Sequence, residues 1–180
     1  MSKRKKSINF TIEVLDFFLG IPESFLDGLD RKKFYHHLNG QFSEKKFTYS
    51  NICKLFNNFK KVGYINVQTN GNQRSIKFTN KAKLAVVDRL VERFELDGQY
   101  RFISFDIPET MKVNRNRFRR TIKRMGFIQV QKSLWVCDKN VTDFIEIAAA
   151  EYSVSEYIVY IVSNQFDARK NVEEMFKKMK

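Results

Sequence analysis

Three stretches of this sequence carry residues whose types and spacing could bind a metal ion or a nucleic acid. The first is Asp106, which follows the predicted strand 101–105 with its apolar residues Phe102, Ile103 and Phe105. A carboxylate at a strand end can hold Mg²⁺ and support phosphodiester hydrolysis, especially where a dimer axis brings its symmetry mate close. The same carboxylate could instead accept hydrogen bonds from the next turn, or pair with an arginine of the following helix.

One aspartate does not make a metal site by itself, because a hydrolytic metal centre normally has several ligands. Asp106 is therefore a catalytic and metal-binding candidate only for a nuclease that uses Mg²⁺, and we expect no other cofactor. The adjacent His36 and His37 add no second site, since neighbouring side chains on a helix point about 100° apart. Cys53 and Cys137 are the two cysteines, and they form no C-x-x-C pair typical of a zinc site.

The second stretch is the segment 48–62, in which apolar residues recur at helical spacing and polar residues fall on the other face. Asparagine can bond adenine edges and lysine can reach guanine when such a helix lies in the major groove. Any surface helix is polar outside, so it is the lack of acidic residues that favours DNA over a solvated face. The candidate DNA-binding residues, including two from the following hairpin, are Tyr49, Asn51, Lys54, Asn57, Asn58, Lys61, Arg74 and Lys77.

The third stretch is a predicted helix over 111–125 that holds seven basic residues and no acidic one. Arginine and lysine at this density are typical of contacts with phosphate groups. The candidate phosphate-binding residues are Arg115, Arg119, Arg120 and Lys123.

The whole chain is basic, with 33 Lys and Arg against 20 Asp and Glu, a net charge of +13 and a pI near 9.8. This charge places a polyanion first among the candidate partners. The alternative is a compositional bias, because Lys, Asn, Ile and Phe are all common here, as an AT-rich genome would produce.

The sequence predicts a cytoplasmic protein with no membrane partner. The scarcity of cysteine fits a reducing compartment, and no apolar run approaches the ~18 residues of a membrane span. The basic residues 1–6 lack the apolar region of a signal peptide, so we expect a flexible arm over residues 1–7.

Residues 8–79 have the pattern of a winged helix-turn-helix domain. Helices are predicted over 9–19, over 22–38 as one bent or two short helices, and over 48–62. Two alternating segments, 64–69 and 73–78, flank Asn70-Gly71, a dipeptide that favours a hairpin turn.

A connector helix is predicted over 80–97, starting after an N-cap at Thr79 and ending at a domain boundary at Asp97-Gly98. Residues 98–163 then follow the order strand, helix, strand, strand, helix, strand, which predicts a ferredoxin-like βαββαβ domain. A C-terminal helix is predicted within 164–180. The expected fold class is α+β.

The second half also resembles a known family. The segments RFISFDIPE and FRRTIKRMGFIQVQKSLWV resemble the middle domain of the PaaX (phenylacetate-operon repressor) family, which is itself similar to the CRISPR-associated Cas2 proteins. PaaX-like repressors carry a winged helix before that domain, so the resemblance covers residues 8–163. In Cas2 proteins the aspartate that matches Asp106 is the proposed Mg²⁺ ligand of a dimeric nuclease.

The resemblance implies a transcriptional regulator, of the repressor type, that binds double-stranded DNA as a homodimer on a two-fold related site. PaaX repressors continue into a large C-terminal domain whereas this chain stops after one predicted helix, so a small-molecule effector is not expected. Two alternatives stay open: a Mg²⁺-dependent Cas2-like nuclease, and a non-catalytic subunit of a CRISPR adaptation complex.

Overall fold

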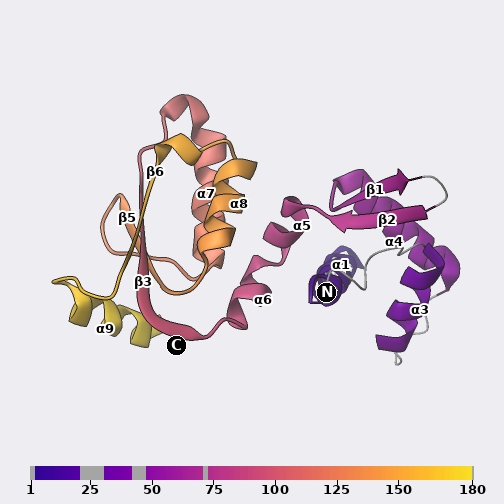
Figure 1. Ribbon diagram of the computed structural model, residues 1–180, viewed down its shortest axis with the longest axis horizontal. Helices are drawn as coiled ribbons and strands as arrows, with labels where there is room; N and C mark the ends of the chain where they lie inside the picture. Colours follow the sequence, from indigo (N-terminus) through magenta and orange to yellow (C-terminus); the bar gives the residue numbers. More distant parts are fainter. Residues whose placement is uncertain (1–2, 21–30, 42–47, 71–72, 180) are drawn as a thin grey trace. The chain divides into compact units, whose positions relative to one another are not determined.

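The computed structural model describes residues 3–20, 31–41, 48–70 and 73–179 (Figure 1). The chain mixes helices and strands, as expected for the predicted α+β class. It forms two compact units, Met1–Val86 and Val87–Lys180. In the described part of the chain, no helix is long and apolar enough to cross a membrane.

The first unit consists of helices followed by an antiparallel hairpin and one more helix. Its elements are α1 (Lys3–Leu19), α3 (Arg31–Gln41), α4 (Tyr49–Val62), β1 (Ile65–Asn70), β2 (Gln73–Phe78) and α5 (Asn80–Ala85). The predicted helix over 48–62 is confirmed as α4, and the predicted N-cap at Thr79 is confirmed by its side chain, which accepts from the N–H of Ala82. Gly63 ends α4 at φ +80°, a conformation that glycine adopts without strain.

Two expectations for the first unit were wrong at their edges. Residues 3–7, predicted as a flexible arm, are the first turns of α1, because a Lys- and Arg-rich stretch without Gly or Pro continues a helix readily. α3 runs to Gln41, beyond the predicted end of this helical segment at residue 38. Residues 22–30 of the predicted second helix and Gly71 of the predicted turn lie outside the described residues.

An aromatic core holds the first unit together. Phe34 on α3 is fully buried, and its ring stacks on Phe18 of α1 at 4.4 Å between centroids. The same ring meets Phe56 and Phe59 of α4 edge-on at 5.7 and 6.2 Å. Since these contacts come from three helices, they fix α4 against its neighbours and leave its opposite face to solvent.

The second unit is built around one four-stranded antiparallel sheet in the order β4-β5-β3-β6. Its elements are α6 (Val87–Glu92), β3 (Leu96–Phe105), the 3₁₀ turn η1 (Glu109–Met111), α7 (Lys112–Arg124), β4 (Ile128–Gln129), β5 (Leu134–Lys139), α8 (Thr142–Glu151), the 3₁₀ turn η2 (Ser155–Tyr157), β6 (Ile158–Ser163) and α9 (Arg169–Met179). The predicted order of strands and helices over 98–163 is confirmed.

The predicted connector helix over 80–97 is two helices, α5 and α6, separated at Val86. Val86 has φ −119° and ψ 17°, outside the helical range, at a pair of β-branched valines that lose side-chain freedom in a helix. The compact units divide at this break. Asp97-Gly98 lies instead inside β3, where Gly98 has φ +73° and the pairing with β5 shifts register, as at a β-bulge.

The bulge is tied by an ion pair between buried Arg101 and exposed Asp97. Arg101, 3% exposed, donates to both carboxylate oxygens of Asp97 and to the carbonyl oxygen of Gln99 at 3.1 Å. The hydrogen bonds from Arg101 hold the pKa of Asp97 at about 2. Asp97 therefore remains ionised across the physiological range and keeps the start of β3 in register.

Helices cover both faces of the sheet, with α7 and α8 on one face and α9 on the other (Figure 1). On the α7 face, the ring of Phe105 meets Phe118 edge-on at 5.4 Å and stacks on Trp135 at 6.4 Å. On the α9 face, Tyr100 and Val136 pack against Val172. Alternate residues of β3 therefore face different helices.

Candidate nucleic-acid interface

α4 presents one exposed polar face whose centre is Lys54. At 100° per residue, most of its exposed polar residues lie within about 60° of Lys54 around the helix axis, and the buried residues Ile52, Phe56 and Phe59 lie on the opposite side. Five of the six α4 residues predicted to bind DNA share this exposed face: Asn51, Lys54, Asn57, Asn58 and Lys61. The structure thus brings these five together.

Tyr49 does not belong to that face. It lies about 140° around the axis from Lys54, and its ring contacts the ring of Tyr35 on α3 at 5.6 Å. The side chain is half exposed, and it lies at the first position of α4. The sequence signal that placed it with the others was only its proximity in the chain.

The hairpin supplies the remaining two predicted residues. Lys77 on β2 is exposed and pairs across the hairpin with Asn66. The backbone of Arg74 pairs with Thr69, while the side chain of Arg74 lies outside the described part of the structure. The hairpin therefore adds one described cation.

The face of α4 is suited to a polyanion with hydrogen-bonding groups. It contains amide side chains that both donate and accept, and lysine ammonium groups that donate only. α4 contains no acidic residue. Lys60 and Lys61 also lie in its last turn, where a cation is favourable for the helix dipole even without a ligand.

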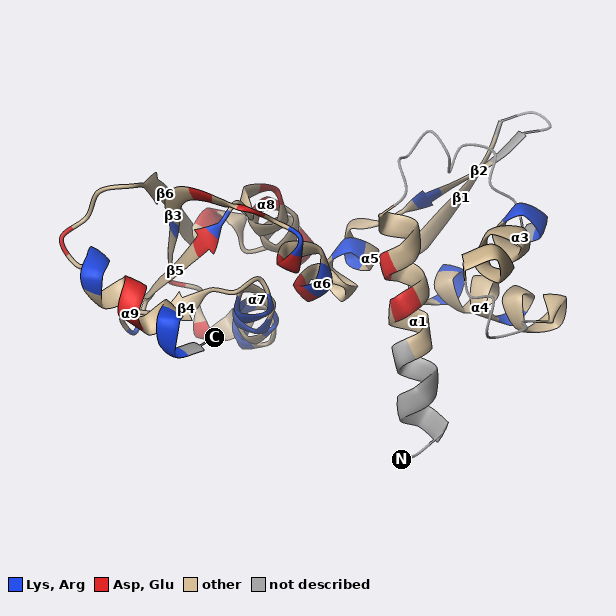
Figure 2. Ribbon diagram, turned by 90° about the horizontal axis from the view of Figure 1, so that it is seen from below, with Lys and Arg blue, Asp and Glu red and all other residues tan. Residues whose placement is uncertain are grey.

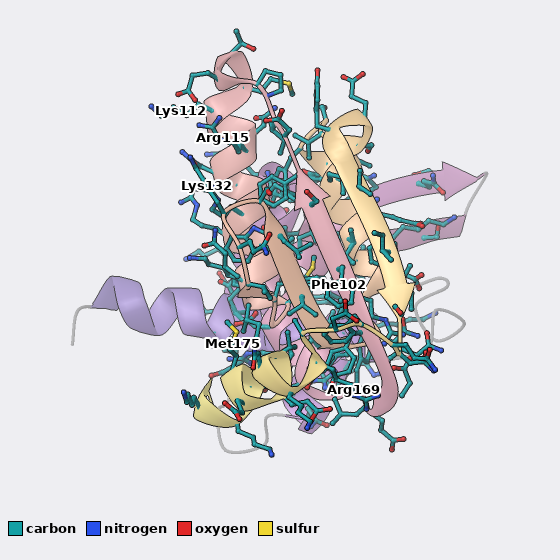
Figure 3. All side chains as sticks on the ribbon, turned by 90° about the vertical axis from the view of Figure 1, so that its left-hand side faces the viewer. Phe102, Lys112, Arg115, Lys132, Arg169 and Met175 are labelled. Atoms are coloured by element: carbon teal, nitrogen blue, oxygen red, sulfur yellow. The ribbon has the colours of Figure 1, made fainter. Side chains whose placement is uncertain are left out.

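α7 differs sharply in charge from α8, which covers the same face of the sheet. α7 has five arginines, two lysines and no acidic residue, whereas α8 has Asp143, Glu146, Glu151 and no basic residue. Figure 2 shows the blue of Lys and Arg along α7 and the red of Asp and Glu on α8. In Figure 3, Lys112, Arg115 and Lys132 lie along one side of this unit.

Arg115, one of the four predicted phosphate-binding residues, is engaged within the fold. It donates to the carbonyl oxygen of Ile107 at 3.2 Å and to the carboxylate of Glu109 at 2.6 Å, and its side chain is only 22% exposed. Lys112 lies 3.2 Å from the same carboxylate. Hydrogen bonds from Arg115 and Lys112 lower the pKa of Glu109, which keeps the carboxylate charged and these two cations neutralised.

The other three predicted residues, Arg119, Arg120 and Lys123, remain available and are called here the α7 basic surface. None of them pairs with an acidic side chain in the part of the chain that the structure describes. Arg119 lies over the ring of Phe105 at 5.9 Å, and Lys123 lies over the ring of Trp135 at 5.5 Å. Arg120 donates from Nε to the carbonyl oxygen of Asn116 at 3.1 Å.

Asp106 follows β3 directly and is exposed. Its backbone N–H donates to the carbonyl oxygen of Tyr157 at 3.1 Å, while Arg115, the first of the five arginines of the following helix, pairs with Glu109. Within the described residues, no group of three His, Cys, Asp or Glu side chains could hold a metal ion. One protomer therefore offers a single predicted ligand at Asp106.

Sequence reasoning missed an apolar surface on the α9 face of the sheet. Val159 and Ile161 of β6 are 60% and 53% exposed, and they lie opposite Ser104 and Phe102 of β3. α9 packs through Val172, Met175 and Phe176 on other residues of that face, as the positions of Met175 and Phe102 in Figure 3 illustrate. The run of apolar residues in 157–162 predicted the strand but not which of its faces would be exposed.

One comparison with known proteins gives a match. A family model described as the PaaX protein central Cas2-like domain matches residues 93–175. The match covers nearly all of the second unit, including β3, α7 and the sheet, and it stops before the end of α9. No curated protein matches the chain.

Proposed function

This chain is a PaaX-family-like protein through its Cas2-like domain, and on that basis we propose that it is a DNA-binding transcriptional regulator of the repressor type that acts as a homodimer. The proposal assigns sequence recognition to the first unit and dimer formation to the second. Its natural target is a duplex site with two-fold related halves, because a symmetric dimer presents two copies of one recognition element.

The order of elements supports a winged helix in the first unit and a ferredoxin-like fold in the second. In the first unit α3 and α4 precede the β1-β2 hairpin, as the recognition helix precedes the wing in a winged helix. In the second unit the strand order β4-β5-β3-β6 corresponds to the split βαβ arrangement of that fold.

The observation that carries the proposal is the acid-free polar face of α4. Lys54, Asn57 and Asn58 are exposed there, while Ile52, Phe56 and Phe59 anchor the helix in the aromatic core. A helix held rigidly from behind can enter a major groove without losing its packing, and asparagine and lysine have donor and acceptor patterns that match base edges.

Dimer formation is assigned to the open sheet surface, defined as Ser104, Leu134, Val159 and Ile161. Covering the exposed apolar residues Val159 and Ile161 of β6 lowers the free energy of the protein, and a second copy of the same surface is self-complementary about a two-fold axis. Ile161→Glu should convert a dimer to a monomer in analytical ultracentrifugation. Val113→Glu is the matched control, since Val113 is 62% exposed on α7 and lies outside that surface. A dimer that survives Ile161→Glu contradicts this assignment.

Selection of bound sequences from a random duplex pool tests the function. We expect a palindromic consensus, and a gel-shift titration on it should give an affinity whose logarithm falls linearly with the logarithm of salt concentration. A pool that stays random after selection, or an affinity that does not change with salt, overturns the proposal.

The same samples distinguish the regulator from the nuclease predicted at Asp106. Incubation of the selected duplex, a random duplex and single-stranded RNA with Mg²⁺ should leave all three intact. Cleavage by the wild type that is lost in Asp106→Ala would replace the regulator with a metal-dependent nuclease.

A further inference from the structure

The positive charge of the second unit is concentrated on α7 rather than spread over its surface. Five of the chain's 12 arginines lie in this one 13-residue helix. All the charged residues of the neighbouring α8 are acidic. A compositional bias toward lysine does not place arginines together on one helix. The arrangement therefore calls for a ligand that binds guanidinium groups, and phosphate is the anion whose geometry they match best.

Arg119 keeps the phosphate-binding part of its side chain accessible. Its Nε is buried without a hydrogen-bond partner, whereas neither of its terminal amino groups is both buried and without a partner, and the residue as a whole is partly exposed. These amino groups donate no hydrogen bond to any of the described residues. The two terminal groups form the fork that binds a phosphate or carboxylate in a bidentate manner.

Two of the three cations in the α7 basic surface are held in place by aromatic rings. Arg119 and Lys123 lie over Phe105 and Trp135, and these two rings stack on each other. Arg119 and Lys123 are also one helical turn apart, so their charges are neighbours on the same face. Because the rings restrict both side chains before any ligand arrives, less conformational entropy is lost when a ligand binds.

We propose that the α7 basic surface binds the phosphate backbone of duplex DNA and is a second DNA contact of this protein, in addition to α4. The inference rests on the proposed function for the identity of the ligand. The residues are those that bind phosphates rather than base edges, so this contact is independent of sequence. Because both contacts belong to one chain, binding at one raises the effective concentration of DNA at the other.

The test compares two triple variants of the full-length protein that each remove three positive charges from the second unit. Arg119→Ala with Arg120→Ala and Lys123→Ala removes the α7 basic surface. Lys170→Ala with Lys177→Ala and Lys178→Ala removes three exposed lysines of α9, a helix that also carries Glu173 and Glu174. Circular dichroism melting confirms that both are folded, and fluorescence anisotropy gives affinities on the selected and on a scrambled duplex at several salt concentrations.

The α7 variant should bind both duplexes on the order of 10- to 100-fold more weakly, and its salt slope should fall by about one for each phosphate group that it no longer binds. The α9 variant should change affinity less than threefold, because charges beyond the screening distance of about 8 Å contribute little at physiological salt. Equal reductions in both variants would mean that net charge alone matters and would overturn the inference.

Failure of this inference is distinguishable from failure of the proposed function. If the wild type selects a consensus but the α7 variant binds like the α9 variant, the second DNA contact is absent and the proposed regulator function is retained. If the wild type selects no consensus, the proposed regulator function is wrong whether or not the α7 variant binds DNA more weakly. Binding of single-stranded RNA at least as tightly as duplex DNA, with the same dependence on α7, would assign the surface to RNA and overturn the DNA contact.

Discussion

α4 and α7 are both exposed helices without an acidic residue, yet their side chains are suited to different parts of a DNA duplex. α4 combines three asparagines with lysines and has no arginine, whereas α7 has five arginines and no asparagine in its basic surface. Asparagine distinguishes base edges through paired donors and acceptors, while arginine binds phosphates strongly whatever the sequence. The absence of acidic residues alone would have treated the two helices as equivalent.

The two helices also differ in what lies behind them. The aromatic core around Phe34 supports α4 from the side opposite its polar face. On α7 the aromatic rings reach the charged residues themselves, since Phe105 and Trp135 lie under Arg119 and Lys123. The first arrangement fixes a helix through the face opposite its polar side chains. The second fixes individual charges, which suits a regular phosphate backbone.

The largest expected effect comes from removing the support of α4. Phe34→Ala should lower the free energy of unfolding by about 3–5 kcal/mol, because a fully buried ring that touches three other rings leaves a cavity. Urea denaturation measures the decrease, and discrimination between the selected and scrambled duplexes should fall with it. Phe118→Ala, which empties the corresponding place under α7, should instead weaken binding to both duplexes equally. Reduced discrimination in both variants would contradict the division between the helices.

Changing the recognition face itself should have the next largest effect. Lys54→Ala with Asn58→Ala should reduce affinity for the selected duplex by about 100-fold, because each base contact is worth roughly 1–3 kcal/mol of discrimination. Affinity for the scrambled duplex should fall less than threefold. Lys60→Ala is the control, since Lys60 is exposed on the same helix but lies about 120° from Lys54. Equal reductions on both duplexes would make α4 a phosphate contact like α7.

The sequence correctly predicted the helices and strands whose patterns depend only on residues close together in the chain. The apolar spacing in 48–62 and the apolar residues in 101–105 predicted α4 and β3 because each pattern depends on neighbours in the chain. Asp97-Gly98 misled because a turn signal is the same at a domain boundary and at a β-bulge. Only the partner strand, absent from the local sequence, distinguishes the two.

The candidate sites were predictable in composition but not in detail. Arg115 and Arg119 are equivalent in the sequence, as basic residues one turn apart on α7. Folding brings Glu109 to Arg115 and Phe105 under Arg119, and these contacts made by residues outside the helix decide which cation stays available. The sequence also did not predict that Ile161 is exposed, because an apolar residue in a strand does not indicate which face of the sheet a later helix will cover.

Replacing arginine by lysine tests whether geometry or charge matters on α7. Arg119→Lys with Arg120→Lys keeps the charge but removes the planar fork, so affinity for both duplexes should fall by about 3- to 10-fold while the salt slope stays unchanged. Lys54→Arg makes the opposite exchange on α4 and should alter the preferred base rather than the overall affinity. Anisotropy titrations on the selected duplex and its single-base variants measure both. If the Arg→Lys variant binds like the wild type, the positive charge of α7 and not the geometry of its guanidinium groups determines the affinity.

The smallest expected effect is a gain. Glu109→Gln removes the carboxylate that occupies Arg115 and Lys112, so two more cations become available beside the α7 basic surface. Affinity for any duplex should rise about twofold and the salt slope should increase by about one. Asp106→Asn is the matched control, because it removes one negative charge from an exposed side chain three residues earlier in the chain. If both variants gain equally, the change reflects net charge. A gain in Glu109→Gln alone shows that the pairing of Arg115, and not the total charge of the unit, sets how much of α7 contacts DNA.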